Sequence, residues 1–229
     1  MQTHSGFLLS SIKYGDHDVI LHCFTKENGF ESFFVKNIYA KKNKKKPYLF
    51  PLNEIHFNTA VTSKSSSLKN INKIERCISF DFDDDFKANS IIFFLAEFFN
   101  TTLKNETSSA YVYNEILHLK HQLNVKNYQC HLIFLIKFLH YQGCSPLFDG
   151  GLFLNAEDGK FSSVQDSRYF SEEISTIWKN ILVSEDPYLL KINSTLRKEV
   201  LESVMRYYQI HVPHFRVPES WEIVQQIFD

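Results

Sequence analysis

Six lysines lie between positions 36 and 46 with no acidic residue among them: Lys36, Lys41, Lys42, Lys44, Lys45 and Lys46. Closely spaced ammonium groups attract polyanions, because each can neutralise a phosphate of a nucleic-acid backbone. Residues 1–80 hold 12 Lys and Arg against 6 Asp and Glu, whereas residues 81–229 hold 13 against 20, so the net charge of −1 conceals a basic and an acidic part. The basic part favours a nucleic-acid ligand; the alternative is a solvated loop that keeps a strand edge soluble.

Other residues near this run extend the basic track or offer aromatic rings. Three further cations lie in a strand-like segment downstream: Lys69, Lys73 and Arg76. Three tyrosines flank the lysines: Tyr14, Tyr39 and Tyr48. Tyrosine rings stack on the bases of single strands, but they also anchor loops by packing, and both interpretations stay open here.

The sequence contains none of the common catalytic or nucleotide-binding motifs that we considered. No glycine precedes a Lys-Ser or Lys-Thr pair, and there is no dinucleotide fingerprint, HExxH or G-x-S-x-G. Four acids lie close together ahead of a helical segment: Asp81, Asp83, Asp84 and Asp85. We expect them to cap the helix, and the alternative is a metal-dependent nuclease. Nuclease sites usually gather carboxylates from separate elements, so we predict a binding protein rather than an enzyme.

The cysteines and histidines predict no metal and no cofactor. The four cysteines, Cys23, Cys77, Cys130 and Cys144, form no CxxC pair and are expected to be free thiols in a reducing cytosol. His140 lies four residues before Cys144, but two ligands do not close a structural zinc site. The longest apolar run, residues 91–96, is far shorter than the roughly 20 residues that cross a bilayer, so we expect no membrane segment.

The lysines lie in a part of the chain whose apolar residues alternate with period two. Glu27-Asn28-Gly29 has the composition of a hairpin turn. The alternation predicts five strands, over residues 6–13, 19–25, 30–36, 52–61 and 68–80. Five short strands joined by tight turns and one basic loop suit an OB-fold barrel, which commonly binds oligonucleotides.

After residue 82 the apolar period becomes helical. We predict helices over residues 86–103, 108–123, 128–141, 171–182, 194–210 and 218–228, with Ser171 as the N-cap of the fourth. Residues 143–170 hold four of the seven glycines and are predicted to be irregular. The chain is therefore predicted to be α+β, with an OB-fold domain in residues 1–82 and an all-α helical domain in residues 83–229.

A series of short motifs runs through the first 36 residues: Gly6-Phe7-Leu8-Leu9, Lys13-Tyr14-Gly15-Asp16, Asp18, Phe24-Thr25, Gly29 and Lys36. In this order they resemble the start of the RecO family of bacterial recombination-mediator proteins. That family opens with a G-x-[VL]-L strand, a turn ending in glycine and an acid, a strand end in threonine, a glycine turn and a basic loop. The resemblance continues through residues 90–103 and 132–143 to Arg206-Tyr207-Tyr208 and His211, and so covers essentially the whole chain.

The resemblance implies a function in DNA repair and recombination. It implies binding of single- and double-stranded DNA, annealing of complementary strands, and action with RecR to help RecA filaments form on single strands coated by SSB. RecR is expected to dock mainly on the barrel. The protein is expected in the bacterial cytoplasm, associated with the nucleoid. The alternative is a protein-interaction scaffold that does not bind DNA.

Two further expectations come from the same resemblance. In the family the helical domain receives the acidic, Phe-ending tail of SSB, for which Lys137 and Arg206 are the candidate contacts here. Lys137 alternatively extends from a core helix to water, and Arg206 alternatively pairs with Glu202 one turn back. Many family members bind zinc through four cysteines in the region equivalent to 144–170, where this chain has only Cys144, so a zinc-free member is predicted.

Overall fold

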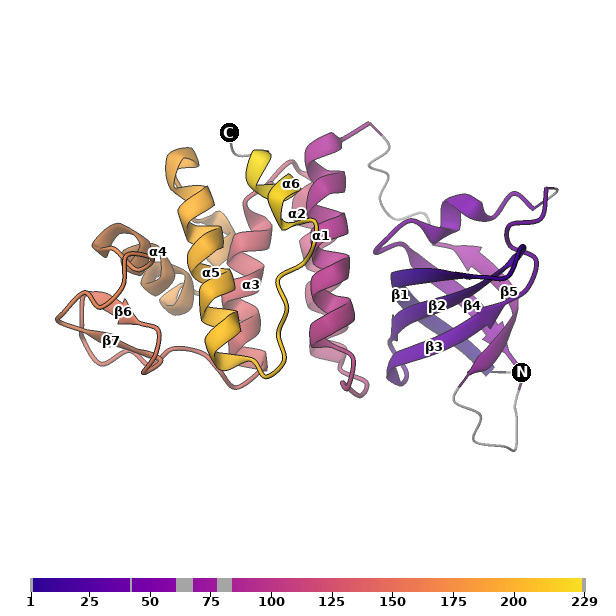
Figure 1. Cartoon of the computed structure of the whole chain (residues 1–229), viewed down its shortest axis with the longest axis horizontal. Helices are drawn as coiled ribbons and strands as arrows, with labels where there is room; N and C mark the ends of the chain where they lie inside the picture. Colours follow the sequence, from indigo (N-terminus) through magenta and orange to yellow (C-terminus); the bar gives the residue numbers. More distant parts are fainter. Residues whose placement is uncertain (1, 42, 61–67, 78–83, 228–229) are drawn as a thin grey trace. The chain divides into compact units, whose positions relative to one another are not determined.

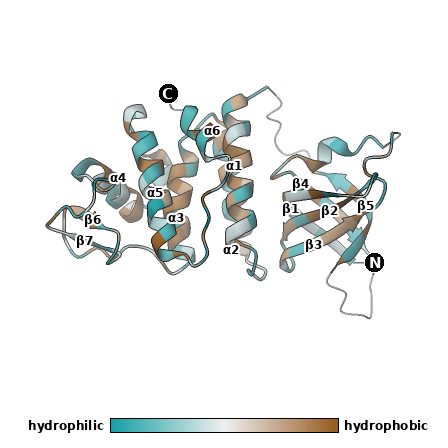
Figure 2. Cartoon of the chain, in the orientation of Figure 1, coloured by the Kyte–Doolittle hydropathy of each residue, from teal (hydrophilic) through white to brown (hydrophobic). Residues whose placement is uncertain are grey.

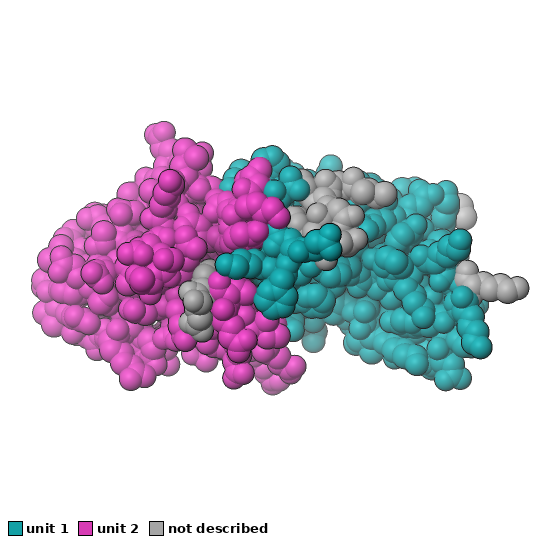
Figure 3. Space-filling model, turned by 90° about the horizontal axis from the view of Figure 1, so that it is seen from above, with its two compact units in different colours: residues 1–124 teal, residues 125–229 magenta. Residues whose placement is uncertain are grey.

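The computed structural model describes residues 2–41, 43–60, 68–77 and 84–227. The chain divides into two compact units, residues 1–124 and 125–229 (Figures 1 and 3). The domain boundary predicted between residues 82 and 83 lies outside the described residues and stays a prediction. Within the described ranges, no helix is both long and apolar enough to cross a membrane.

The first unit contains a closed barrel of five strands: β1 (Gln2–Tyr14), β2 (Asp18–Thr25), β3 (Gly29–Val35), β4 (Glu54–Thr59) and β5 (Lys69–Arg76). Their order around the barrel is β1-β2-β3-β5-β4, and β4 closes it by pairing with β1. The β3–β5 pair is parallel and the other pairs are antiparallel. This architecture confirms the predicted OB-type barrel.

The length of β1 allows the barrel to close. Its first half pairs with β4 and its second half with β2, with a register irregularity between Leu8 and Ser10. Because side chains alternate across each strand, one face of every strand fills the interior. The hydrophobic core of the barrel consists of Leu8, Val19, Leu21, Cys23, Phe33, Val35, Ile38, Ile55, Phe57, Ile71 and Ile74.

The turn between β2 and β3 confirms the predicted hairpin. Gly29 has a φ of +80°, in the left-handed region that favours glycine. A Cβ at this position would lie 2.4 Å from the carbonyl oxygen of Glu106, so only glycine fits. The Phe30 N–H donates to the same oxygen at 3.1 Å, which ties the hairpin to the segment after the first helix.

Two helices complete the first unit, α1 (Phe86–Thr102) and α2 (Ala110–Asn124). The Asp85 side chain caps α1 by accepting from the Ala88 N–H at 3.0 Å, as predicted for this acidic stretch; Asp81 and Asp83 lie outside the described residues. Ser10 of β1 donates to Asn100 of α1 at 3.0 Å, and the rings of Phe7 and Tyr113 are 4.6 Å apart. Both helices therefore pack against the barrel within one unit.

The second unit is built on α3 (Cys130–Tyr141), α4 (Glu172–Val183), α5 (Arg197–His211) and α6 (Trp221–Gln226). Helix α3 is buried on nearly every side, which agrees with its hydrophobic colour in Figure 2. Ser171 caps α4 as predicted, accepting from Ile174 N–H. The segment 143–170, predicted to be irregular, contains a short antiparallel hairpin, β6 (Phe153–Asn155) and β7 (Lys160–Ser162). Strands of three residues are too short to show period two in a sequence.

Candidate nucleic-acid interface

The lysine loop, residues 36–46, joins β3 to the short 3-10 helix Lys46–Leu49, and hydrogen bonds hold it on the barrel. Asn37 takes a φ of +58°, and its N–H donates to Asp18 Oδ1 at 2.7 Å. The Tyr39 N–H donates to His17 O at 3.0 Å, while Ile38 is buried in the barrel core. The β1–β2 turn therefore fixes the start of the loop and defines where its lysines emerge.

The loop presents its lysines to solvent. Lys36, Lys41, Lys44 and Lys46 are exposed, Lys45 is half-buried, and Lys42 lies outside the described residues. Within the described part of the chain, no carboxylate forms an ion pair with Lys36, Lys41 or Lys44. These ammonium groups are available to external anions.

A cavity of about 480 Å³ opens beside the loop. Lys36 and Lys45 line it together with the amide side chains of Asn43, Asn70 and Asn72, over a floor of apolar core residues. Amide groups both donate and accept hydrogen bonds, as base edges do. The structure thus brings two of the predicted lysines to one polar-edged pocket near β5.

The three tyrosines have different environments. Tyr39 and Tyr48 pack against the barrel core, and the ammonium of Lys46 lies 5.8 Å from the centre of the Tyr39 ring. Tyr14 instead is 58% exposed, with its ring edge-on to Phe34 at 5.6 Å. Loop anchoring therefore accounts for Tyr39 and Tyr48, whereas Tyr14 offers an exposed ring close to the start of the loop.

The sequence patterns did not single out the outward apolar row beside Tyr14. Ile12 pairs with Ile20 across β1 and β2, and Ile20 pairs with Phe34 across β2 and β3, so the three side chains share one face. Ile12 is 53% exposed. The sequence of β2 did indicate an apolar outer face, because both of its faces carry apolar residues. The sequence of one strand, however, does not show which residues of other strands lie beside it.

Two of the three predicted cations on β5, Lys69 and Lys73, form ion pairs with acidic side chains. The Lys69 ammonium pairs with Glu31 on β3, and Lys73 pairs with Glu75 at 2.7 Å. Burial works to raise the pKa of Glu31, but hydrogen bonds from Lys69 and Asn28 outweigh it and hold that pKa below its usual value. Arg76 is half-buried at the end of the same strand. Lys69 and Lys73 therefore differ from Lys36, Lys41 and Lys44, because they already have carboxylate partners.

The two predicted partner contacts in the second unit are not brought together in one groove. Arg206 lines a groove of about 660 Å³ with Arg168, Tyr169, Met205 and Trp221, and Lys137 is not among its lining residues. The Lys137 ammonium instead lies 5.0 Å from the centre of the Tyr188 ring. Arg206 pairs with Glu157 at 3.2 Å rather than with Glu202, so the alternative pairing one turn back is wrong.

Potential metal ligands meet in one group of three among the described residues, and that group lies on the barrel rather than in segment 143–170. It consists of Glu54, His56 and Cys77. The aspartates considered for a nuclease do not form such a group within the described residues; Asp84 is exposed, and Asp85 is occupied as the helix cap.

A closed barrel with this strand order defines the first unit as an OB-type fold. The family described as "Recombination protein O N terminal" matches residues 1–80. The chain is also similar over its full length to DNA repair proteins named RecO. The RecO of Bacteroides fragilis is 27% identical over 245 residues, which cover 100% of both chains. The RecO of Phocaeicola vulgatus is 28% identical over 244 residues, which cover 100% of this chain and 99% of the relative. The RecO of Flavobacterium johnsoniae is 26% identical over 231 residues, 96% of each chain. The first 80 residues thus match the RecO N-terminal family, and the chain as a whole is similar to RecO DNA repair proteins.

Proposed function

We propose that this protein binds single- and double-stranded DNA, anneals complementary strands, and acts with RecR to help load RecA on single strands coated by SSB. The match of residues 1–80 to the RecO N-terminal family and the full-length similarity to RecO DNA repair proteins support this proposal. The observation that carries the DNA-binding part is the lysine loop: an anchored loop of an OB-type barrel exposes several cations, three of them outside any described ion pair. In this role the protein does not need to make or break covalent bonds.

The loop lysines contact phosphates, and Tyr14 stacks on bases. Phosphate contacts do not depend on sequence, which suits a protein that must act on any single strand. The Tyr14 ring is available for stacking because it leans edge-on against Phe34 and leaves most of its surface exposed. Annealing follows from the same charge, since two strands repel each other less when a basic surface neutralises both.

The groove lined by Arg168 and Arg206 suits the acidic, Phe-ending tail of SSB. Two guanidinium groups at its edge supply charge-assisted hydrogen bonds for carboxylates. Met205, Val217 and Trp221 supply apolar surface for an aromatic side chain. RecR is proposed to dock on the barrel, and RecA to be reached through the other two partners.

The test is an annealing assay with two complementary oligonucleotides that carry a fluorescence donor and acceptor. We expect the full chain to bind each single strand at low salt and to accelerate their annealing, with both strands recovered intact in the presence of magnesium. Failure to bind at low salt would favour the scaffold alternative. Shortened strands would instead indicate a nuclease.

A further inference from the structure

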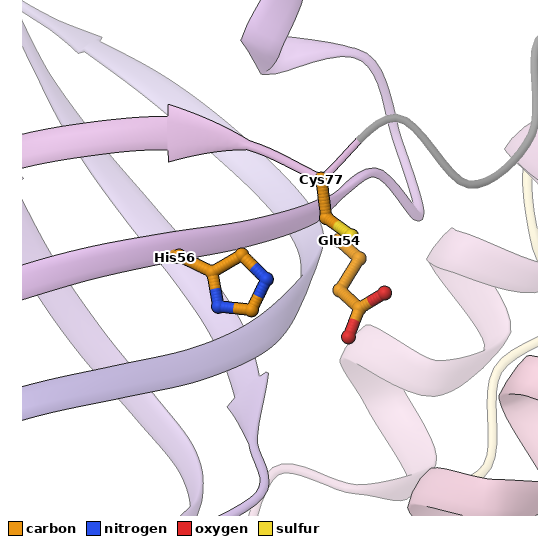
Figure 4. Close-up of side chains that lie close together, drawn as sticks. All are labelled: Glu54, His56 and Cys77. Carbon is orange, nitrogen blue, oxygen red and sulfur yellow. The ribbon is translucent and has the colours of Figure 1, made fainter.

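Three side chains of different chemical type converge at one end of the outer face of the barrel. Glu54 and His56 are two residues apart on β4, so both point to the same face. Cys77 directly follows β5 and is opposite Glu54, since its N–H donates to Glu54 O at 2.9 Å. The candidate ligand atoms of the three residues all lie within 4.8 Å of one another (Figure 4).

The imidazole of His56 is oriented toward the other two groups. Its Nδ1 is hydrogen-bonded to Ser5 Oγ at 2.9 Å. Figure 4 shows the opposite ring nitrogen, Nε2, directed toward Glu54 and Cys77. When Nδ1 carries the proton and donates it to Ser5, the lone pair of Nε2 faces the group. In metal sites, a hydrogen bond to one ring nitrogen of a histidine orients the other nitrogen toward the metal in this way.

The carboxylate of Glu54 is also held from behind. Tyr113 of α2 donates its hydroxyl proton to Glu54 Oε1 at 2.8 Å, which leaves Oε2 for another contact. Tyr113 is itself buried, with its ring 4.6 Å from that of Phe7. The carboxylate therefore has a fixed position between the helix and the barrel.

We propose that Glu54, His56 and Cys77 bind a divalent transition-metal ion, with zinc as the best match and a fourth coordination position left open. Thiolate, imidazole and carboxylate are the three ligand types that zinc prefers. Ligand atoms around tetrahedral zinc are roughly 3.3–3.7 Å apart, given metal–ligand distances of about 2.0–2.3 Å. The ligand atoms of the three residues now lie within 4.8 Å of one another, and small side-chain rotations would bring them to the shorter distances of a zinc site. Binding releases the thiol proton of Cys77 to solvent, and the thiolate and carboxylate then balance the charge of the ion.

Two cations near the group limit its affinity. Lys120 lies close enough to Glu54 to interact with its charge, although its ammonium donates to Leu52 O at 2.7 Å. Arg76 adjoins Cys77 in the chain and also interacts with Lys120. We therefore expect an exchangeable ion, held more weakly than in a closed site with four ligands.

The test is a titration of the reduced full chain with cobalt(II), whose spectrum reports its ligands. We expect one equivalent to bind with a thiolate-to-cobalt charge-transfer band in the near ultraviolet. Cys77→Ser should abolish this band. Cys144→Ser is the matched control, because Cys144 is also half-buried, lies near His140 in sequence, and should leave the band unchanged. Absence of the band in the unaltered protein, or its persistence in Cys77→Ser, would overturn the proposal.

Two further measurements keep the test independent of folding in the cysteine variant. X-ray absorption of the zinc-loaded unaltered chain should show one sulfur ligand among nitrogen and oxygen ligands; no sulfur, or two, would overturn the proposal. Tyr113→Phe keeps the ring and removes the bond to Glu54, so it should weaken metal binding by about 10–100-fold without removing the thiolate band.

Discussion

Replacing five loop lysines by alanine should flatten the salt dependence of single-stranded DNA binding. The substitutions are Lys36→Ala, Lys41→Ala, Lys44→Ala, Lys45→Ala and Lys46→Ala. Each neutralised phosphate contributes about −0.7 to the slope of log affinity against log salt. Contacts from only the three loop lysines described as exposed and outside ion pairs, Lys36, Lys41 and Lys44, give a slope near −2. Contacts from all five give a slope near −3.5.

This range converts into a measurable loss of affinity. A fourfold rise in salt, from about 50 to about 200 mM, should weaken binding of the unaltered chain by roughly 16-fold to 130-fold over these slopes. The same rise should change the affinity of the loop variant by much less. Fluorescence anisotropy of a labelled oligonucleotide across a salt series measures both slopes.

The matched control replaces the two β5 cations that already have carboxylate partners, Lys69→Ala and Lys73→Ala. Because Glu31 and Glu75 hold these ammonium groups, removing them should change the slope by less than about 0.7 for each lysine. An unchanged slope in the loop variant, or equal flattening in the control, would show that exposure and ion pairing do not decide which lysines meet DNA.

Three other predictions concern His131, the arginines of the groove in the second unit, and Tyr14. Burial lowers the pKa of His131 to about 4, so the unfolded state takes up a proton first as the pH falls below 6.5. Stability should therefore fall by about 2 kcal/mol between pH 7 and pH 5 in urea unfolding, and His131→Gln should remove most of that dependence. Arg168→Ala with Arg206→Ala should weaken binding of an acidic peptide ending in Phe at least tenfold by calorimetry, whereas Lys137→Ala should not; equal losses would place the peptide elsewhere. Tyr14→Ala should reduce single-strand affinity by about 1–3 kcal/mol with an unchanged salt slope, and a changed slope would contradict stacking.

Local patterns were enough to predict most of the elements. The alternation of apolar residues with period two predicted the five strands. The pair Asn28-Gly29 predicted a turn in which only glycine fits at position 29. Helical period and polar caps located the helices, with Asp85 and Ser171 in the predicted capping roles. These features depend on residues within one turn or strand of each other, so a sequence read in short windows contains them.

Contacts between distant residues were not predictable in the same way. Lys69 and Glu31 are 38 positions apart, and their pairing depends on β5 lying beside β3 in a parallel ladder. Glu54 and Cys77 meet only because β5 also pairs with β4. Hydrophobic periodicity indicates which face of a strand is buried, but it does not indicate which strand becomes the neighbour.

The position of β5 between β3 and β4 therefore gives the side chains of β5 different neighbours on its two sides. On one side it brings Lys69, a cation predicted from the sequence to contact DNA, to the carboxylate of Glu31. On the other side it brings Cys77 to Glu54 and His56, and so assembles a ligand set that no spacing in the sequence suggested. The described residues between β3 and the 3-10 helix form no strand, and within the described residues Lys36, Lys41 and Lys44 have no carboxylate partner. We therefore propose that the cations of this barrel that contact nucleic acid are the loop lysines that lie outside the strand ladders.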